Sequence, residues 1–157
     1  MPVISAGVLV FRRTRALEVL LVHPGGPFWA SKDDGAWSIP KGLAGESEAP
    51  LAAALRELAE ETGLRAQGDL FDLGSHKQRG GKTIVAFALE QDFDVSRLES
   101  NLFSMEWPPR SGRMAEFPEV DRAGWFPFEA ARLKITKGQV PILRALAERL
   151  GIDFPER

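Results

Sequence analysis

Short apolar runs separated by polar segments occupy the first part of the chain. Residues 4–11 are apolar and rich in β-branched side chains, and a second apolar run at 19–22 follows the basic segment 12–15. This pattern predicts two strands joined by a basic turn. A short strand is predicted later, around residues 124–126.

Two further apolar runs predict a hairpin. Residues 70–74 and 83–89 have strand composition, and Arg79-Gly80-Gly81 lies between them as a turn. A hairpin is therefore the simplest interpretation of this segment.

Helical periodicity occurs in two segments. Residues 50–62 begin with Pro50, which a first helical turn tolerates, and stop before Gly63, a common residue after a helix C-terminus. Ser47 is the best candidate for its N-cap. Residues 140–150 repeat apolar side chains at helical spacing and predict an outer helix.

Two irregular segments are rich in Gly, Pro and aromatic residues. The segment between His23 and Trp37 is predicted to be a loop that folds over another part of the protein, with Phe28 and Trp29 either as nucleobase walls or as a small satellite core. Residues 101–119 contain 107–113, which cannot form a regular element. We expect a long, functional loop there.

Composition limits the possible classes of protein. The 157 residues are 44% hydrophobic and 27% charged, as expected for one soluble globular domain spanning 1–157. No apolar run is long enough to cross a membrane, and Met1-Pro2-Val3-Ile4-Ser5 does not begin a signal peptide, so a cytoplasmic location is expected.

The chain has no cysteine and two histidines, which excludes thiolate sites and histidine-rich metal clusters. Any metal must be held mainly by carboxylates, carbonyls and water, the ligands of Mg²⁺, Mn²⁺ or Ca²⁺. The net charge of −2 gives no reason to expect double-stranded nucleic acid as a partner.

The predicted helix 50–62 has one apolar and one acidic face. Helical spacing places Leu51, Leu55, Leu58 and Thr62 on one face, predicted to be the core side. The opposite face carries Arg56 and three glutamates, with Ala53 one turn earlier. Taken alone, an acidic face is typical of a solvated helix surface. The glutamates are Glu57, Glu60 and Glu61.

The residues around this helix change that interpretation. Gly42 and Glu48 precede the helix, and Arg56-Glu57-Leu58-Ala59-Glu60-Glu61-Thr62-Gly63-Leu64 follows at the spacing of a known motif. The stretch resembles the Nudix hydrolase signature at every fixed position. The resemblance implies an α/β/α sandwich with a mixed central sheet, and Mg²⁺-dependent hydrolysis of a nucleoside diphosphate linked to another group, with Mn²⁺ as a possible substitute.

The resemblance also implies residue roles. Glu57, Glu60 and Glu61 are the expected metal ligands, and Gly42 leaves the Lys41 carbonyl free to approach a metal. Structural support is expected from an ion pair between Arg56 and Glu48, and from Gly63. The general base stays open between Glu57 and an acid on a later loop, either Glu119 or Glu116. Glu119 is the first choice on that loop and could also bind metal.

Cationic side chains outside the signature are candidate phosphate contacts. The segment that leads into the signature is Trp37-Ser38-Ile39-Pro40-Lys41-Gly42. It is similar to the corresponding segment of Nudix branches that act on diadenosine polyphosphates and diphosphoinositol polyphosphates. Lys41 is therefore an expected substrate contact, whereas Trp37 is expected to pack. Lys82 beside the hairpin turn and Arg110, with Arg113, in the later loop are further candidates; a solvated loop explains the arginines equally well.

The resemblance favours dinucleoside polyphosphates as substrates, followed by nucleoside triphosphates and then ADP-ribose or diphosphoinositol polyphosphates. Removal of pyrophosphate from RNA 5′ ends is a further option that the net charge does not support. The rival hypotheses are a non-catalytic nucleotide sensor on the same fold and a small-molecule binding module with a decorative acidic helix. A homodimer is possible, and His23 and His76 are expected to be structural or solvated.

Overall fold

A mixed sheet of six strands forms the centre of the protein. The computed structural model describes residues 3–155. Met1 and Pro2 begin the segment in which no signal peptide is expected, and they lie outside the described residues. The strand order is β4-β5-β1-β2-β8, and β3 pairs with β1. The strands are β1 (Val3–Arg13), β2 (Leu17–Pro24), β3 (Lys41–Leu43), β4 (Phe71–Lys77), β5 (Lys82–Glu90) and β8 (Val120–Pro127).

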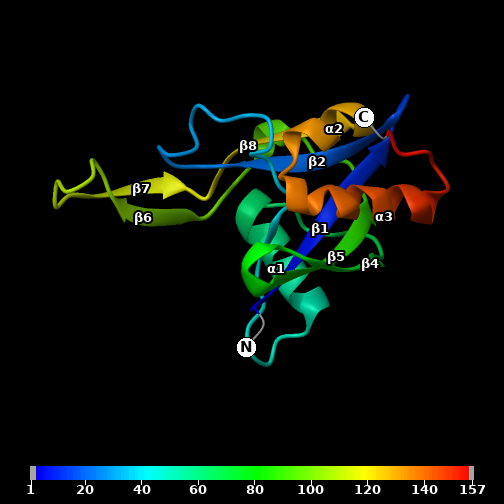
Figure 1. Ribbon diagram of the computed structural model, residues 1–157, viewed down its shortest axis with the longest axis horizontal. Helices are drawn as coiled ribbons and strands as arrows, with labels where there is room; N and C mark the ends of the chain where they lie inside the picture. The colour runs from blue at the N-terminus through cyan, green and yellow to red at the C-terminus, as the bar shows by residue number, and fades with distance from the viewer. Residues whose placement is uncertain (1–2, 156–157) are drawn as a thin grey trace.

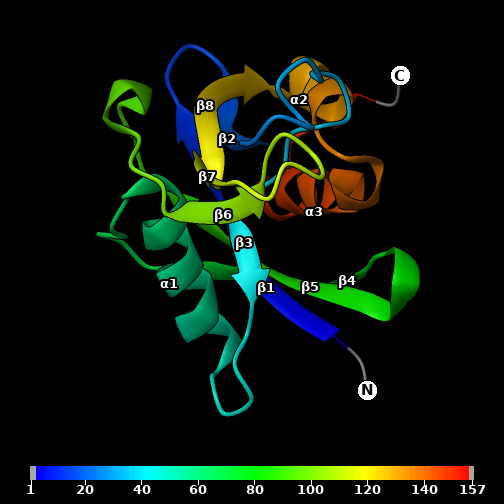
Figure 2. The same ribbon diagram turned by 90° about the vertical axis from the view of Figure 1, so that its left-hand side faces the viewer.

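Strand β1 is buried on both faces because helices cover both sides of the sheet. It pairs in parallel with β5 and antiparallel with β2 and β3. Its even-numbered residues, such as Val8, belong to the core under α1 (Pro50–Thr62), and its odd-numbered ones, such as Leu9, to the core under α2 (Phe128–Lys134) and α3 (Val140–Leu150). Figure 2 shows α1 on one side of the sheet and α2 and α3 on the other. The expected α/β/α sandwich is confirmed.

Helix α1 has the predicted bounds but a different start and a different buried face. Its N-cap is Ala49, which makes no side-chain cap, so Ser47 was the wrong choice. Gly63 ends the helix with a φ of 81°, and its N–H donates to the Ala59 carbonyl at 2.8 Å. Leu51 is 43% exposed, whereas Ala53 is fully buried against the sheet. A small side chain lets the helix approach β1 closely, so the buried face is rotated towards Glu57.

The segment predicted as a long loop is largely a two-stranded arm. Strands β6 (Leu102–Glu106) and β7 (Met114–Pro118) pair antiparallel, and only 107–113 between them is irregular. Figure 1 shows this arm projecting from the body of the protein. Phe103 and Phe117 are half-buried on one face, while Leu102 and Met114 are exposed on the other.

The remaining predicted elements are present. The hairpin of β4 and β5 turns at η1 (Arg79–Gly81), and α3 ends at Gly151 as expected. Helix α2 was not predicted, because it is only seven residues long. Two more 3₁₀ turns are η2 (Val95–Arg97) and η3 (Lys137–Gln139). Within residues 3–155, no helix is long and apolar enough to cross a membrane.

Candidate active site

Strand β3 lies directly against the acidic side of α1. The Lys41 N–H donates to a Glu61 carboxylate oxygen at 3.3 Å, and the Leu43 carbonyl accepts from Arg56 at 2.9 Å. Because the N–H and C=O of one residue in an antiparallel strand point to the same side, the Lys41 carbonyl also faces α1. Gly42 lies between them: a Cβ at this position would overlap the Glu57 carboxylate.

Arg56 ties the helix to the loop before it. Its guanidinium donates two hydrogen bonds of 2.9 Å to Glu48, one of 2.9 Å to Glu57 and one of 3.3 Å to Glu60. The expected ion pair between Arg56 and Glu48 is therefore present. Hydrogen bonds from Arg56 and from the Gly45 N–H lower the pKa of Glu48 to about 2.

Two further carboxylates, Glu61 on α1 and Glu119 immediately before β8, line the same pocket. Burial raises the pKa of Glu61 to about 8, with smaller contributions from the charges of Glu57 and Glu119. The pKa of Glu119 is also raised, by burial and then by the charges of Glu57 and Glu60. Carboxylates from two separate segments thus repel one another at a single place, which is an arrangement that a bound cation would stabilise.

These carboxylates line a pocket of about 290 Å³. Lys41, Glu61 and Glu119 are its charged lining residues. The other lining residues are uncharged and include the aromatic Trp29 and the polar Gln139, so the pocket combines charged, polar and apolar groups. The full lining consists of Val22, Pro24, Trp29, Gly35, Ala36, Ser38, Lys41, Glu61, Glu119, Val120, Thr136 and Gln139.

The loop that carries Trp29 is supported by the arm. Phe28 packs edge-on against Trp107, with ring centroids 5.6 Å apart. Gly26 lies against Phe103, where a Cβ would come within 2.9 Å of the ring. The loop is also held by the Gly25 N–H, which donates to the Glu119 carbonyl at 2.9 Å. The arm therefore holds one wall of the pocket.

The pocket and its carboxylates lie within the part of the chain that the NUDIX domain model matches, residues 1–146. The chain belongs to the Nudix family. Two RNA pyrophosphohydrolases are similar to it over 87% of its length: one from Agrobacterium fabrum (28% identical, 88% of that protein covered) and one from Brucella anthropi (31% identical, 86% covered). The chain is accordingly a Nudix pyrophosphohydrolase.

Solved Nudix structures share the fold at low identity. The NUDIX domain of Shewanella oneidensis NrtR, complexed with ADP ribose, superposes with a TM-score of 0.64 at 19% identity, covering 96% of this chain and 89% of that one. The C. elegans Ap4A hydrolase binary complex gives a TM-score of 0.63 at 19% identity, covering 94% and 98%.

Nudix enzymes typically depend on a divalent metal, and the donor set of this site suits one. Hard carboxylate and carbonyl oxygens are the ligands that Mg²⁺ prefers. Within residues 3–155, no group of three or more acidic or histidine side chains is already arranged to hold a metal ion. The reason is local: Arg56 holds Glu57 and Glu60, while Glu61 accepts from the Lys41 N–H. Metal binding therefore requires these side chains to exchange partners.

Other predicted site residues lie outside the pocket. Lys82 lines a neighbouring cavity, and Glu60 lines a different one beside Gly63. Arg110 lies at the tip of the arm, where its backbone N–H donates to Glu106 at 3.2 Å, and Glu116 is exposed on β7.

The contacts of His23, His76 and Trp37 are structural. His23 is fully buried, with Nδ1 at 2.8 Å from Asp121 and Nε2 at 2.6 Å from the Lys32 carbonyl. His76 Nε2 lies 2.8 Å from the Leu73 carbonyl. Trp37 packs edge-on against Phe126, as expected.

Sequence reasoning missed Gln139. Its side chain is buried and bridges η3 to the segment before β3: its carbonyl oxygen accepts from the Ile39 N–H at 3.0 Å, and its amide donates to Ser38 Oγ at 2.9 Å. A lone glutamine after Lys137-Gly138 gives no local signal, because its role depends on a partner 100 residues away.

Proposed function

We propose that this enzyme hydrolyses a phosphoanhydride of a 5′-polyphosphorylated nucleotide by attack of water at phosphorus. One observation carries the proposal: Lys41, Glu61 and Glu119 line the same pocket as Trp29 and other uncharged side chains. Such a pocket matches a ligand with a polyanionic end and a planar, less polar end.

The carboxylates are assigned to the metal and the reacting phosphates. Glu61, Glu119 and the Lys41 carbonyl at the pocket, with Glu57 and Glu60 from the same helix as Glu61, would hold Mg²⁺, with Mn²⁺ as a substitute. Bound Mg²⁺ neutralises the pyrophosphate and supplies an activated water. The Lys41 ammonium adds a point charge for phosphate. Glu119 is our choice of general base, because it lines the pocket while Glu57 is held by Arg56 and Glu116 lies on the arm.

Trp29 and the polar lining residues are assigned to the nucleoside. Trp29 is 43% exposed and lines the pocket, so its indole is assigned to stack on a base. Ser38, Thr136 and Gln139 supply polar groups on the same lining. Phe28 packs on the arm instead of lining the pocket, which fits the alternative expectation for this loop, a small satellite core.

The names of similar proteins are consistent with this class of substrate. RNA pyrophosphohydrolases and an Ap4A hydrolase are among them. RNA 5′ ends, dinucleoside polyphosphates and nucleoside triphosphates share a nucleoside joined to a 5′ polyphosphate, the part that the pocket is proposed to bind.

The test is a substrate panel with matched variants. Purified protein with Mg²⁺ is given diadenosine polyphosphates, nucleoside triphosphates, ADP-ribose, diphosphoinositol polyphosphates and 5′-triphosphorylated RNA in ¹⁸O-labelled water, and the products are identified. We expect Glu61→Gln and Glu119→Gln each to lower kcat by at least about 10²-fold. Glu46→Gln, an exposed carboxylate in the loop before α1, should keep wild-type kcat. Binding of nucleotide and metal without any turnover would replace this proposal with a nucleotide sensor.

A further inference from the structure

A second cavity adjoins the candidate active site and has a different character. It measures about 630 Å³ and shares Gly35 and Thr136 with the first pocket. Its other lining residues come from the β4–β5 turn and from η3: Gln78, Arg79, Lys82, Lys137 and Gly138. We call this cavity the basic groove. Because the two cavities share wall residues, they adjoin each other at Gly35 and Thr136.

The groove is cationic and its charges are not neutralised by the protein. Arg79, Lys82 and Lys137 are all exposed, and no acidic residue is part of the lining. Among the described residues, none of these three cations makes an ion pair. The nearby acids Asp33 and Asp34, on the loop that leads to Gly35, are both paired with Lys134, at 2.6 and 3.3 Å. Three like charges along one groove favour an anionic ligand.

The walls of the groove are fixed to each other. The Gln78 side-chain amide donates to the Gly138 carbonyl at 2.8 Å, which joins the hairpin turn to η3. The Gln78 N–H also donates to the Lys82 carbonyl at 2.8 Å and closes the turn. A side chain at Gly138 would collide with the Gln78 amide, so the two segments are in close contact. The groove is thus a built feature of the fold.

The order of the parts indicates what the anion is. Lys41, Glu61 and Glu119 line the first pocket. Gly35 and Thr136 border both the pocket and the groove, whereas those three residues line the pocket only. A ligand with its 5′ phosphates at the carboxylates and its nucleoside in the pocket would reach the groove with whatever follows that nucleoside. In a dinucleoside polyphosphate, all the phosphates lie between the two nucleosides. In an RNA, a phosphodiester follows the first nucleoside.

From this order we infer that the basic groove binds the phosphodiester after the first nucleotide, so that the preferred substrate is a single-stranded RNA with a 5′ polyphosphate. The inference rests on the proposed function for the placement of the 5′ phosphates. The net charge of −2 does not oppose it, because the three cations are concentrated at one place.

The experiment compares a substrate that reaches the groove with substrates that do not. Hydrolysis of a 5′-triphosphorylated RNA tetramer, ATP and diadenosine tetraphosphate is measured in wild type, Arg79→Gln and Lys137→Gln. We expect wild type to prefer the RNA. In each variant, the kcat/KM for RNA divided by that for ATP should fall about tenfold, and the slope of log Kd for the RNA against log salt should decrease by about 0.7 per lost phosphate contact.

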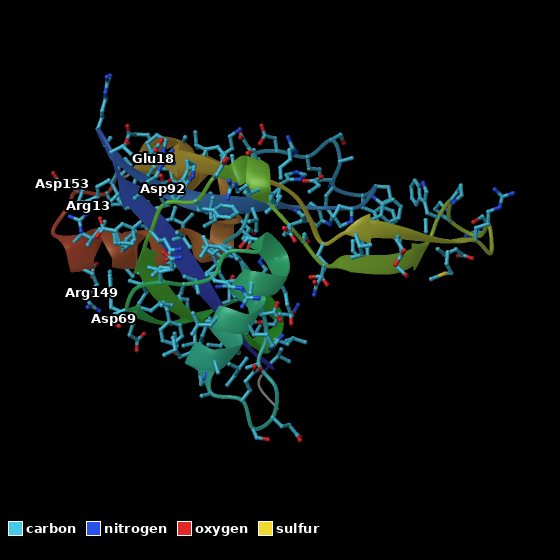
Figure 3. All side chains as sticks on the ribbon, turned by 180° about the vertical axis from the view of Figure 1, so that it is seen from behind. Arg13, Glu18, Asp69, Asp92, Arg149 and Asp153 are labelled. Atoms are coloured by element: carbon cyan, nitrogen blue, oxygen red, sulfur yellow. The ribbon has the colours of Figure 1, made fainter. Side chains whose placement is uncertain are left out.

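Arg13→Gln is the matched control. It also removes one exposed positive charge, but Arg13 lies at the opposite end of the β1–β5 pair from Lys82, roughly 30 Å away over nine paired positions. Figure 3 shows Arg13 at the end of the sheet away from the arm. Both the RNA-to-ATP ratio and the salt slope should match wild type in this variant.

Binding of the fluorescein-labelled RNA tetramer without metal separates the two proposals. If Arg79→Gln and Lys137→Gln weaken binding but wild type hydrolyses nothing, the groove assignment stands and the proposed function fails. If wild type hydrolyses nucleotides but both groove variants bind and cleave RNA like Arg13→Gln, the groove assignment is wrong. A preference for diadenosine tetraphosphate over RNA would also overturn it.

Discussion

At the scale of single residues, Gly42 decides where the Glu57 carboxylate can lie. A methyl group at this position would overlap that carboxylate, so Gly42→Ala must displace a proposed metal ligand. Because a misplacement of about 1 Å in a catalytic site can cost about 10²-fold in rate, we expect kcat to fall on that order.

The matched control for this prediction is Gly45→Ala in the same loop. A methyl at Gly45 would meet Glu48 at 3.6 Å, which is ordinary van der Waals contact. Steady-state kinetics and thermal unfolding of both variants provide the measurement. Equal kcat values in the two variants would show that the position of Glu57 does not matter for turnover.

The ion pair of Glu48 with Arg56 gives a pH-dependent contribution to stability. Arg56 lowers the pKa of Glu48 from an ordinary 4.5 to about 2. A carboxylate with a lowered folded-state pKa stabilises the protein above its unfolded-state pKa, and this contribution is lost as the pH falls towards the folded-state value. The free energy of unfolding of wild type should therefore exceed that of Glu48→Gln by a constant amount near pH 7, and this difference should shrink between about pH 5 and pH 2.

Urea unfolding of both proteins across this pH range is the measurement. Glu46→Gln, at an exposed position two residues earlier, controls for the loss of a carboxylate in this loop. A wild-type advantage over Glu48→Gln that stays constant down to pH 2 would contradict the assigned pKa.

At the scale of elements, the arm of β6 and β7 supports the pocket from outside. Trp107 contacts Phe28, next to the pocket residue Trp29. An edge-on aromatic pair contributes about 0.5–1.5 kcal/mol beyond area burial, so Trp107→Ala should loosen the loop. Because the carboxylates lie on α1 and β8, we expect KM for a good substrate to rise about threefold to tenfold while kcat stays within about twofold.

Met114→Ala tests whether this effect belongs to the loop-facing side of the arm. Met114 is 68% exposed on the opposite face of the same ribbon, so its removal should leave both constants unchanged. A fall in kcat of Trp107→Ala with KM unchanged would mean that the arm acts on the reacting groups instead of on the loop.

The elements also show which features can be predicted from sequence. Helix α1 was predicted with correct bounds, because Pro50 and Gly63 mark its ends by local chemistry. Its buried face was misassigned, since Leu51 is more hydrophobic than Ala53 but too large for the close approach to β1. The arm was missed for a different reason. Its strands are only five residues long, and the contact between Trp107 and Phe28 leaves no pattern in the local sequence.

The residues of the candidate site also divide into those that a local motif predicts and those that only tertiary contacts bring together. The glutamates of α1 were found because the motif is continuous in sequence, and Glu119 was selected as an acid on the later loop that the resemblance implies. Gln139 joins the pocket only through tertiary contacts. Arg79 and Lys137 were not singled out, because the hairpin turn and η3 meet only in the folded chain.

At the scale of the whole molecule, β1 contributes side chains to two cores, one on each face of the sheet. Leu9 is fully buried in the core under α2 and α3, while its neighbours Val8 and Val10 are fully buried in the core under α1. Loss of packing on one face of β1 therefore weakens the sheet that the other face needs. We expect Leu9→Ala to lower the free energy of unfolding by about 2–5 kcal/mol, and Leu133→Ala, at a position 54% exposed, to change it by less than about 0.5 kcal/mol.

The same arrangement predicts that the two cores unfold together in Leu9→Ala, as expected for one domain. Trp37 belongs to the core under α2 and α3, whereas Trp125 packs against the core under α1. Trp37→Phe and Trp125→Phe, each in the Leu9→Ala background, give fluorescence probes that differ in the core they report. Both should show the same urea midpoint as far-UV circular dichroism. Separate midpoints would mean that α1 and its core remain folded after the opposite core is lost, and that the chain contains two cooperative units joined at β1.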